Sequence, residues 1–319
     1  MKDYILEYIK CPECNGSLIV SRVDKGSDGE IDEGQLKCEK CAHDYSVIDG
    51  IPVLLPAHIS NADEHEIRKK VSDEAAQTVD NWRSQYDPHH FRELAHLRLH
   101  SYIEQLEIQN PRVLDIGVGW GVNYIPLLSD IELWGMDFSL ESLMLLKKIY
   151  KQAGVRVPNL VCGSLGAIPL KNIQFNIISS TQVYQHIPEQ KEIEKSFAAI
   201  IHELLDSPGI FIVDNFNYNY DKVTSHLKKI FRPDKYTDVD QVKNSRAFYY
   251  KFYLKKDFDI LMEEIGGGIK YDVTYTENLF HPDMKLIPRG RVAAIIDAFV
   301  SRLPISKYTG RQISLSVSK

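Results

Sequence analysis

Val113-Leu114-Asp115-Ile116-Gly117-Val118-Gly119-Trp120-Gly121 is the stretch that decides the fold. It is typical of a short buried strand followed by a turn with glycine at every second position, and we expect a helix from about Gly121. A strand, a glycine turn and a helix form the nucleotide-binding corner of a doubly wound α/β sheet. Glycine suits this turn because a ligand must approach the backbone closely there. The stretch therefore predicts an α/β fold.

Two carboxylates specify the ligand of this corner. A second strand, Leu133 to Met136, ends in Asp137, from which a carboxylate can accept hydrogen bonds from two ribose hydroxyls. The glycine spacing is G-x-G-x-G, whereas dinucleotide enzymes carry G-x-G-x-x-G, and Asp115 comes just before the glycines. Because a carboxylate repels a pyrophosphate and attracts an amino group, these residues favour a nucleoside ligand that carries an amine.

With these residues the run resembles the first motif of class I S-adenosylmethionine-dependent methyltransferases, and Asp137 resembles their second-strand ribose acid. The resemblance covers about residues 110–319. It implies an α/β fold with a Rossmann-like seven-stranded sheet whose last strand is antiparallel, and S-adenosylmethionine as cofactor. In this interpretation Asp115 faces the methionine amino group and Asp137 holds the ribose. The implied cofactor-binding residues are Asp115, Gly117, Gly119, Gly121, Asp137, Phe138, Ser164, Leu165 and Thr181.

The rest of the chain follows the strand and helix order of a doubly wound fold. Apolar periodicity predicts a helix over 91–106 before the first strand, and Ser139 is expected to cap a helix that runs to about Ala153. Further strands are expected at 159–162, 175–180, 209–214, 269–276 and 311–317, and further helices at 256–265 and 292–303. The last strand should lie antiparallel between the fifth and the sixth.

The third strand ends in Gly163-Ser164, where many members of the class carry an acid that holds the adenine amino group. Ser164 could make this contact through its hydroxyl or the neighbouring backbone. Phe138 or Leu165 should flank the adenine. The absence of this acid departs from the family pattern. It leaves open the alternative that the chain does not bind the cofactor.

The loop after the fourth strand, residues 181–188, is expected to face the methyl acceptor. His186 resembles a histidine that acts as a base in some members of the class and braces this loop in many others. His186 and Tyr184 are the candidate catalytic residues, and Gln182 also faces the acceptor in this interpretation. The N-P-P-Y-type signature of adenine and glutamine amide methyltransferases is absent, which counts against those two classes.

Residues 1–57 are predicted to form a small zinc-ribbon domain. Cys11 and Cys14 form one C-x-x-C pair, Cys38 and Cys41 form a second, and 23 residues separate the two pairs. Four thiolates complete a tetrahedral zinc site without an open position, so the zinc should be structural. A redox C-x-x-C is the alternative, but it normally occurs singly. With its flanking residues the unit resembles the zinc-ribbon domain of the activator subunit of tRNA and protein methyltransferases.

Residues 58–109 should form a helical linker and cap, followed by the methyltransferase domain over 110–319. Substrate-side insertions are expected at about 216–256 and 277–308. Trp82 and Tyr86, four residues apart, could fold over the cofactor or simply pin the linker to the core. Basic and aromatic residues alternate over 221–256, a pattern that could hold phosphates and stack bases, or form an amphipathic edge strand.

Composition limits the class of protein. The 319 residues are 44% hydrophobic and 26% charged, which is typical of a soluble globular protein. A net charge of −6 argues against a general electrostatic grip on nucleic acid. No apolar run is long enough for a membrane span, and the N-terminus lacks the apolar core of a signal peptide. Five cysteines, four of them in two close pairs, indicate metal binding in a reducing compartment, so we expect a cytoplasmic protein.

These features predict methyl transfer to oxygen or nitrogen of a small polar metabolite or glycan, which the acidic overall charge favours. An RNA methyltransferase acting on rRNA or tRNA is one alternative, favoured by the zinc ribbon and the basic aromatic stretch. A non-catalytic, methyltransferase-like partner subunit is the other, motivated by the missing third-strand acid. The expected partners are therefore a small-molecule or glycan acceptor, or RNA. Neither the acceptor atom nor the oligomeric state follows from the sequence.

Overall fold

The computed structural model describes residues 1–27, 29–57, 90–187, 189–231, 251–266, 268–278 and 291–319. Its strands are β1 (Leu18–Ser27), β2 (Glu30–Cys38), β3 (Asp44–Ile48), β4 (Ile51–Leu54), β5 (Arg112–Ile116), β6 (Glu132–Asp137), β7 (Asn159–Gly163), β8 (Phe175–Thr181), β9 (Leu205–Phe216), β10 (Lys270–Asn278) and β11 (Gly310–Ser318). They form one sheet in the order β1-β2-β3-β4-β7-β6-β5-β8-β9-β11-β10.

The helices lie between these strands. The α-helices are α3 (His90–Leu106), α4 (Leu140–Gln152), α5 (Gln190–Ala199), α6 (Tyr218–Phe231), α8 (Lys255–Ile265), α9 (Arg291–Val300) and α10 (Ser306–Thr309). Shorter turns are the 3-10 helices η1 (Asp3–Tyr8), η3 (Val122–Leu127) and η4 (Tyr184–His186) and the π-helical turn η5 (Ile200–Leu204). None of the described helices is both long and apolar enough to cross a membrane.

The centre of the sheet has the predicted doubly wound topology. β5 pairs in parallel with β6 on one side and with β8 on the other, so the connections leave β5 in opposite directions. Such a switch point opens a crevice at the carboxyl ends of the strands, where ligands bind. β11 runs antiparallel between β9 and β10, which confirms the predicted insertion of the last strand.

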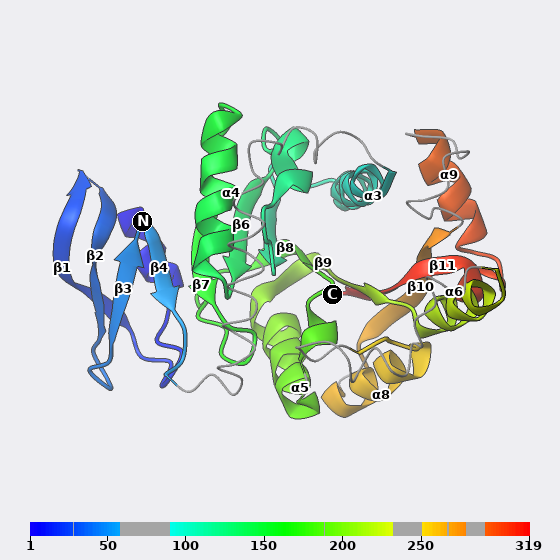
Figure 1. The fold of residues 1–319 in the computed structure, drawn as a ribbon. Coiled ribbons are helices and arrows are strands. Elements are labelled where there is room, and N and C mark those ends of the chain that lie inside the picture. The colour runs from blue at the N-terminus through cyan, green and yellow to red at the C-terminus, as the bar shows by residue number, and fades with distance from the viewer. Residues whose placement is uncertain (28, 58–89, 188, 232–250, 267, 279–290) are drawn as a thin grey trace.

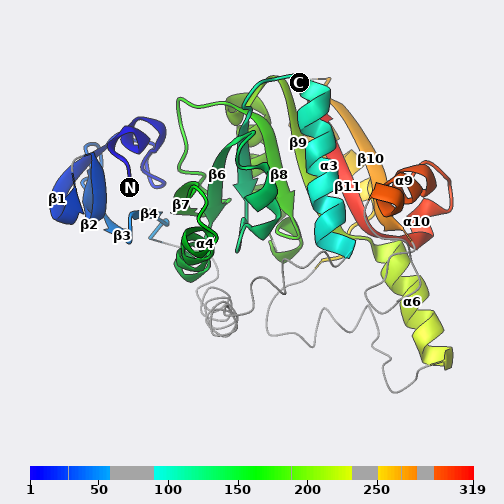
Figure 2. The ribbon, with the colours of Figure 1, turned by 90° about the horizontal axis from the view of Figure 1, so that it is seen from above.

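Helices cover both faces of the sheet (Figure 1). Successive side chains of a strand point to opposite faces, so Val113 faces one layer and Leu114 the other. Val113 belongs to the apolar core beneath α3, η3 and α4, and Leu114 to the core beneath α5 and α8. Seen from above, α3 lies over the β9 and β11 part of the sheet and α4 lies near β7 (Figure 2).

The segment after the glycine turn differs from the predicted helix. Instead of a regular α-helix, Val122–Leu127 forms the 3-10 turn η3 with Pro126 inside it. Proline has no N–H to donate and its ring clashes with the carbonyl four residues earlier, so a regular α-helix through this position is disfavoured by about 3 kcal/mol. In contrast, the predicted cap of α4 is confirmed, because the Ser139 side chain accepts a hydrogen bond from the Ser142 N–H.

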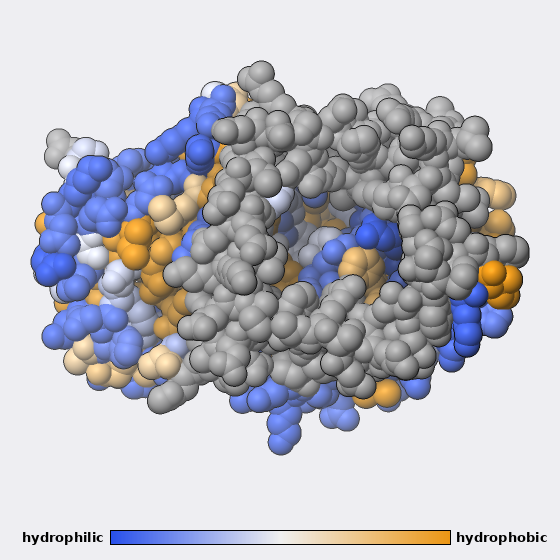
Figure 3. All heavy atoms as spheres, in the orientation of Figure 1, coloured by the Kyte–Doolittle hydropathy of each residue, from blue (hydrophilic) through white to orange (hydrophobic). Residues whose placement is uncertain are grey.

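The zinc-ribbon region continues into the main sheet. β4 pairs in parallel with β7, so the edge of the doubly wound sheet is covered by a strand that precedes residue 57. The Tyr8 ring meets Trp134 of β6 edge-on, with 5.8 Å between the ring centroids, and Lys147 of α4 forms an ion pair with Asp49 at 2.8 Å. One apolar core therefore spans both regions. Most side chains of β1 are exposed, and the outer edge of the ribbon is largely hydrophilic in the view of Figure 3.

Some sequence predictions lie outside the described residues. These are the linker residues 58–89, with Trp82 and Tyr86, and the part of the basic aromatic stretch over 232–250. Of the two regions predicted as insertions, the structure describes α6 in the first and α9 and α10 in the second.

Candidate functional site

A cavity of about 230 Å³ opens at the carboxyl ends of β5, β8 and β9. Strand residues that line it include Asp115, Ser179, Thr181 and Asp214, and α3 contributes Arg98, Leu99 and Tyr102 from the opposite side. A second cavity of about 250 Å³ adjoins it along the glycine turn and shares Asp115, Asn123 and Tyr124 with it. The two cavities lie at the crevice that the strand topology creates.

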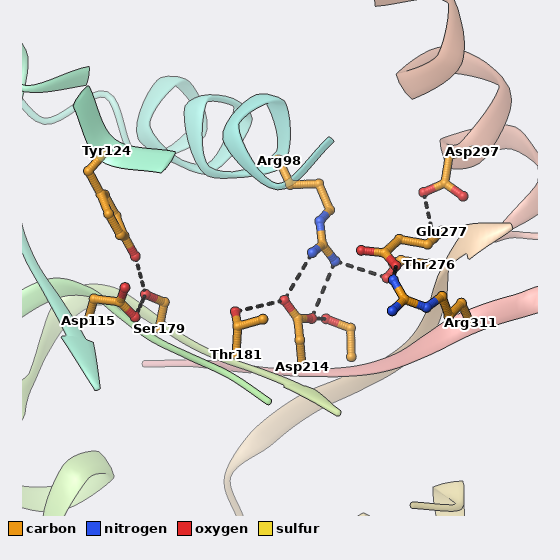
Figure 4. Close-up of polar contacts among 11 residues, drawn as sticks. Arg98, Asp115, Tyr124, Ser179, Thr181, Asp214, Thr276, Glu277, Asp297 and Arg311 are labelled. Carbon is orange, nitrogen blue, oxygen red and sulfur yellow. Dashed lines mark hydrogen bonds and ion pairs between the residues drawn. The ribbon is translucent and has the colours of Figure 1, made fainter. Parts of the chain in front are cut away.

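Strand alternation explains why these polar side chains meet. Asp115 follows Val113 by two positions, Ser179 follows Ile177, and Asp214 follows Ile212, so each polar residue shares a face with an apolar one. The apolar members pack under the helices on this face. The polar members come two positions later, near the ends of the strands, and therefore line the cavity (Figure 4).

The backbone of the glycine turn lines both cavities. The Gly117 N–H donates to the Met136 carbonyl at 2.7 Å, and the Gly119 N–H donates to Oδ2 of Asp137 at 2.9 Å. Gly117 has φ +75° and Gly119 has φ +52°. Only glycine adopts such angles readily. A Cβ built on Gly117 would lie 2.1 Å from Cγ2 of Val183, whereas a Cβ on Gly119 would meet nothing within 4 Å.

Gly117→Ala is therefore expected to lower the free energy of unfolding by about 2–4 kcal/mol, since backbone strain and the collision with Val183 both act. Gly119→Ala is the matched control, with about 1–2 kcal/mol from backbone strain alone. Urea unfolding followed by circular dichroism measures both. Equal destabilisation of the two variants would contradict the role given to Val183.

Asp115 is a buried carboxylate, 8% exposed, without a basic partner among the described residues. Its Oδ1 accepts a hydrogen bond from the Ser179 hydroxyl at 3.0 Å, and the Tyr124 hydroxyl lies 2.6 Å from the same Ser179 oxygen. Burial raises the pKa of Asp115 to about 7, although the hydrogen bonds from Ser179 and Tyr124 act in the opposite direction. Asn123, beside it, has a buried Oδ1 without a partner in the described structure. The arrangement fits a ligand that brings a cation and hydrogen-bond donors.

A second polar group lies where β9, β10 and β11 meet. Arg98 of α3 contacts both oxygens of Asp214, with Nη1 3.3 Å from Oδ1 and Nη2 3.0 Å from Oδ2. Its Nη1 also donates to the Thr276 hydroxyl at 3.0 Å. Next to this pair, Nη1 of Arg311 lies 3.1 Å from Oε2 of Glu277 (Figure 4). Burial raises the pKa of Glu277 to about 7, while the two arginines lower it.

Local sequence did not indicate Arg98, Asn123, Tyr124, Ser179 or Asp214 as site residues. Ser179 and Asp214 could have been identified because each is a polar residue at a position of an apolar strand where alternation predicts a buried side chain. Arg98 had no local signal, because its place over Asp214 depends on how α3 packs.

The residues predicted on the acceptor side do not all lie at the cavity. Thr181 lines the cavity, and its hydroxyl lies 3.4 Å from Oδ2 of Asp214. Tyr184 is 1% exposed; its ring packs against Phe197 at 4.7 Å and its hydroxyl accepts from Ser196. His186 lies in η4, with Nε2 3.3 Å from Nε2 of Gln185. Of these candidates, only Thr181 lines either of the two cavities described.

The residues predicted to hold the ribose and adenine lie along the ends of β6 and β7. Asp137 accepts hydrogen bonds from the backbone N–H groups of Gly119 and Ser139, both at 2.9 Å. The next residue, Phe138, is half-buried. Ser164, just after β7, accepts a hydrogen bond from the Gly166 N–H at 3.3 Å, and Leu165 is buried in the apolar core. These positions follow the order of the strands from β5 outward.

The four cysteines of the ribbon come together, with all Sγ atoms within 4.8 Å of one another. The Sγ atoms of Cys11 and Cys41 are 3.6 Å apart, and those of Cys14 and Cys38 are 3.5 Å apart. Four thiolates placed tetrahedrally at about 2.3 Å from one ion have sulfur–sulfur distances slightly longer than these 3.5 and 3.6 Å. The cluster therefore fits a tetrahedral structural zinc. Tyr45 supports the cluster, with its hydroxyl 3.1 Å from Sγ of Cys11.

Two family models match the chain. Residues 113–207 match a model described as a methyltransferase domain, and residues 2–50 match one described as Trm112p-like protein. None of the curated proteins matches the sequence. Over residues 113–207 the chain is thus an S-adenosylmethionine-dependent methyltransferase domain, and a zinc ribbon of the Trm112p-like type precedes it.

Similar solved structures include an S-adenosylmethionine-dependent methyltransferase from Clostridium acetobutylicum, with 14% identity, a TM-score of 0.48, and coverage of 77% of this chain and 98% of the other. A possible histamine N-methyltransferase from Thermotoga maritima has 17% identity, a TM-score of 0.46, and coverage of 76% and 97%. A complex of the Haloferax volcanii Trm112 methyltransferase activator with a putative methyltransferase has 13% identity, a TM-score of 0.46, and coverage of 77% and 94%.

Proposed function

We propose that this chain, which carries an S-adenosylmethionine-dependent methyltransferase domain, methylates oxygen or nitrogen of a small polar metabolite or glycan. The observation that carries the proposal is the cavity between α3 and the ends of β5, β8 and β9. It is lined by hydroxyl, carboxylate and guanidinium groups. At the end away from the glycine turn the lining includes Thr181 and Arg98, which favours a small polar acceptor.

The cofactor would lie along the glycine turn. When bound, it supplies a methyl group on a positively charged sulfur. Asp115 would hold its amino group, because the carboxylate is buried and has no basic partner among the described residues. The buried Oδ1 of Asn123 would take a further donor. Asp137 would hold the ribose, with Phe138, Ser164 and Leu165 around the adenine.

The acceptor side of the site would be formed by Thr181 and Arg98. Methylation of a hydroxyl or amine joins the methyl group to oxygen or nitrogen, releases one proton and leaves S-adenosylhomocysteine. Aligning the acceptor and excluding water can supply several kcal/mol of the barrier. The Asp214 carboxylate is fully engaged, and Tyr184 is buried among apolar side chains, so neither is placed to take the proton. His186 would brace the loop at the end of β8.

The proposal is tested by methyl transfer from radiolabelled S-adenosylmethionine into fractionated cell extract. Label is expected in the fraction of small molecules and glycans. Label in an RNA fraction that ribonuclease removes would contradict the proposed substrate class and favour the RNA alternative. If calorimetry detects no binding of S-adenosylhomocysteine, the proposed methyltransferase activity is contradicted and the partner-subunit alternative is favoured.

Cofactor binding is expected to weaken as the pH falls through about 7. The ammonium of the cofactor requires the ionised form of Asp115, and burial raises the pKa of this carboxyl to about 7. Between pH 8 and pH 6 the ionised fraction drops about tenfold, so the Kd of S-adenosylhomocysteine should rise by up to about tenfold. Calorimetric titrations at several pH values measure this. In Asp115→Asn the dependence should be absent, and a pH-independent Kd in the unmodified protein would contradict the assignment.

The raised pKa of Asp115 affects the stability of the ligand-free protein in the opposite direction: a fall in pH stabilises the fold, although it weakens cofactor binding. The folded state binds the Asp115 proton more tightly than the unfolded chain, in which this carboxyl has its ordinary pKa of 3.8. This contribution therefore stabilises the protein below about pH 4 and is lost as the pH rises through about 7.

A further inference from the structure

Two ion pairs lie side by side where β9, β10 and β11 meet, and in each the arginine is more exposed than its partner (Figure 4). The side chains of Asp214 and Glu277 are only 6% and 4% exposed, whereas those of Arg98 and Arg311 are 24% and 25% exposed. Arg98 also lines the cavity. A ligand in the cavity can therefore meet a cationic side chain, although the whole protein carries a net charge of −6.

The Asp214 carboxylate has no capacity left for a ligand. Oδ1 takes a hydrogen bond from Nη1 of Arg98 at 3.3 Å and one from the Ser314 hydroxyl. Oδ2 takes one from Nη2 of Arg98 at 3.0 Å and one from the Thr181 hydroxyl at 3.4 Å. Two carboxylate oxygens offer about four acceptor sites, and all are engaged. Asp214 is therefore unsuited to bind an ammonium group of an acceptor.

Arg98, in contrast, keeps donors in reserve. A guanidinium has five N–H bonds, and the contacts of Arg98 with described residues use two on Nη1 and one on Nη2. The Nε–H and the second N–H of Nη2 have no acceptor among the described residues. These two lie side by side on one edge of the planar group, which is the fork that binds a carboxylate with two parallel hydrogen bonds. Nη1 holds Thr276, so the spare edge is the one turned away from β10 (Figure 4).

We propose that this spare edge of Arg98 binds a carboxylate group of the methyl acceptor, so that the substrate class is a small carboxylic acid. The inference rests on the proposed function, because it assumes that the acceptor occupies the cavity that Arg98 and Thr181 line. Asp115, at the cofactor end of the same cavity, selects the amine. Arg98, at the other end, selects the acid. A phosphate dianion fits less well, since the Asp214 carboxylate lies directly behind the guanidinium.

The experiment uses the full chain saturated with S-adenosylhomocysteine. Ligand-observed NMR compares carboxylates with their neutral amides, namely propionate with propionamide, benzoate with benzamide, and salicylate with salicylamide. At least one carboxylate is expected to bind about tenfold more tightly than its amide. Arg98→Gln should abolish that preference while S-adenosylhomocysteine affinity, measured by calorimetry, changes less than twofold.

Two further variants control for folding and for general charge. Arg98→Gln combined with Asp214→Asn keeps a neutral hydrogen-bonded pair in place of the ion pair, and it should show the same loss of preference. Arg112→Gln removes an arginine that pairs with Glu132 at the opposite end of β5, and it should retain the preference.

Three results would overturn the inference, and only the third would also reject the proposed methyltransferase function. Equal binding of every carboxylate and its amide to the complex would reject the carboxylate site and leave the methyltransferase proposal intact. A tenfold loss of S-adenosylhomocysteine affinity in Arg98→Gln, with unchanged affinity for 5′-methylthioadenosine, would assign Arg98 to the carboxylate of the cofactor. Failure of the unmodified chain to bind S-adenosylhomocysteine would reject the proposed function, and this inference with it.

Discussion

Replacing Cys38 with serine is expected to release the zinc and to lower the melting temperature of the whole chain by more than about 10 °C. Structural zinc contributes on the order of 10 kcal/mol to the folding of small cysteine-rich units. The ribbon is such a unit, because its two C-x-x-C pairs come together in one cluster at the end of β2. For a chain of 319 residues each kcal/mol corresponds to about 1.5 °C, so loss of most of this contribution lowers the melting temperature by more than about 10 °C.

The effect should extend beyond the ribbon. β4 pairs with β7, the Tyr8 ring packs on Trp134, and a single apolar core runs from Ile5 to β8. Loss of the ribbon would expose this core and leave β7 as an unprotected edge strand. We therefore expect one unfolding transition in calorimetry, shifted as a whole, together with loss of zinc in elemental analysis.

Cys162→Ala is the matched control for this experiment. Cys162 is buried in the other apolar core and lies outside the cluster of four. The variant should keep a full equivalent of zinc and lose only about 1–2 kcal/mol of stability from the small cavity. Two separate transitions in Cys38→Ser, with the second unchanged from the original protein, would show that the ribbon and the sheet unfold independently and would contradict the expectation.

Asp115→Asn is expected to weaken binding of S-adenosylhomocysteine by about 10- to 100-fold at pH 8. A hydrogen bond to a charged group contributes about 1.5–3 kcal/mol, and the amide that replaces the carboxylate carries no charge. The side chain keeps its shape, and its oxygen can still accept from the Ser179 hydroxyl. Calorimetric titration measures the loss of affinity.

Stability separates this effect from general damage. Because burial raises the pKa of Asp115, the ionised carboxylate is a cost to the folded protein at pH 8. The asparagine variant should therefore melt at the same temperature as the original protein or a few degrees higher. Asp130→Asn, at an exposed position, should change neither affinity nor melting temperature. Unchanged affinity in Asp115→Asn would remove this residue from the cofactor site.

Local patterns predicted most of the fold because each depends on neighbours in sequence. Ser139 caps α4 through a hydrogen bond to Ser142, three residues away. The alternating apolar residues of β10 and β11 form adjacent antiparallel strands. The two C-x-x-C pairs form one cluster because their spacing suits four thiolates around one ion. At Pro126 a local rule opposes the predicted α-helix, and the segment forms the 3-10 turn η3 instead.

The candidate site was predictable only in part. Asp115 and the glycines were identified because strand and turn signals enclose them. Tyr184 was expected at the acceptor, but its ring packs against Phe197 in the core, where burial of an aromatic surface outweighs exposure of its hydroxyl. The sequence does not show on which side of the loop a tyrosine will lie.

By itself, the sequence determined the order of strands and helices, the glycine turn, the metal-binding cysteines and the register that turns Asp115, Ser179 and Asp214 to one face of their strands. Only the tertiary structure decided which of these faces meet. It placed Arg98 of α3 on Asp214, 116 positions later in the chain, and it joined the ribbon to the sheet through β4. The physical reason is that alternation along a strand is a local property, whereas the pairing of strands and the packing of α3 depend on burying one common apolar core.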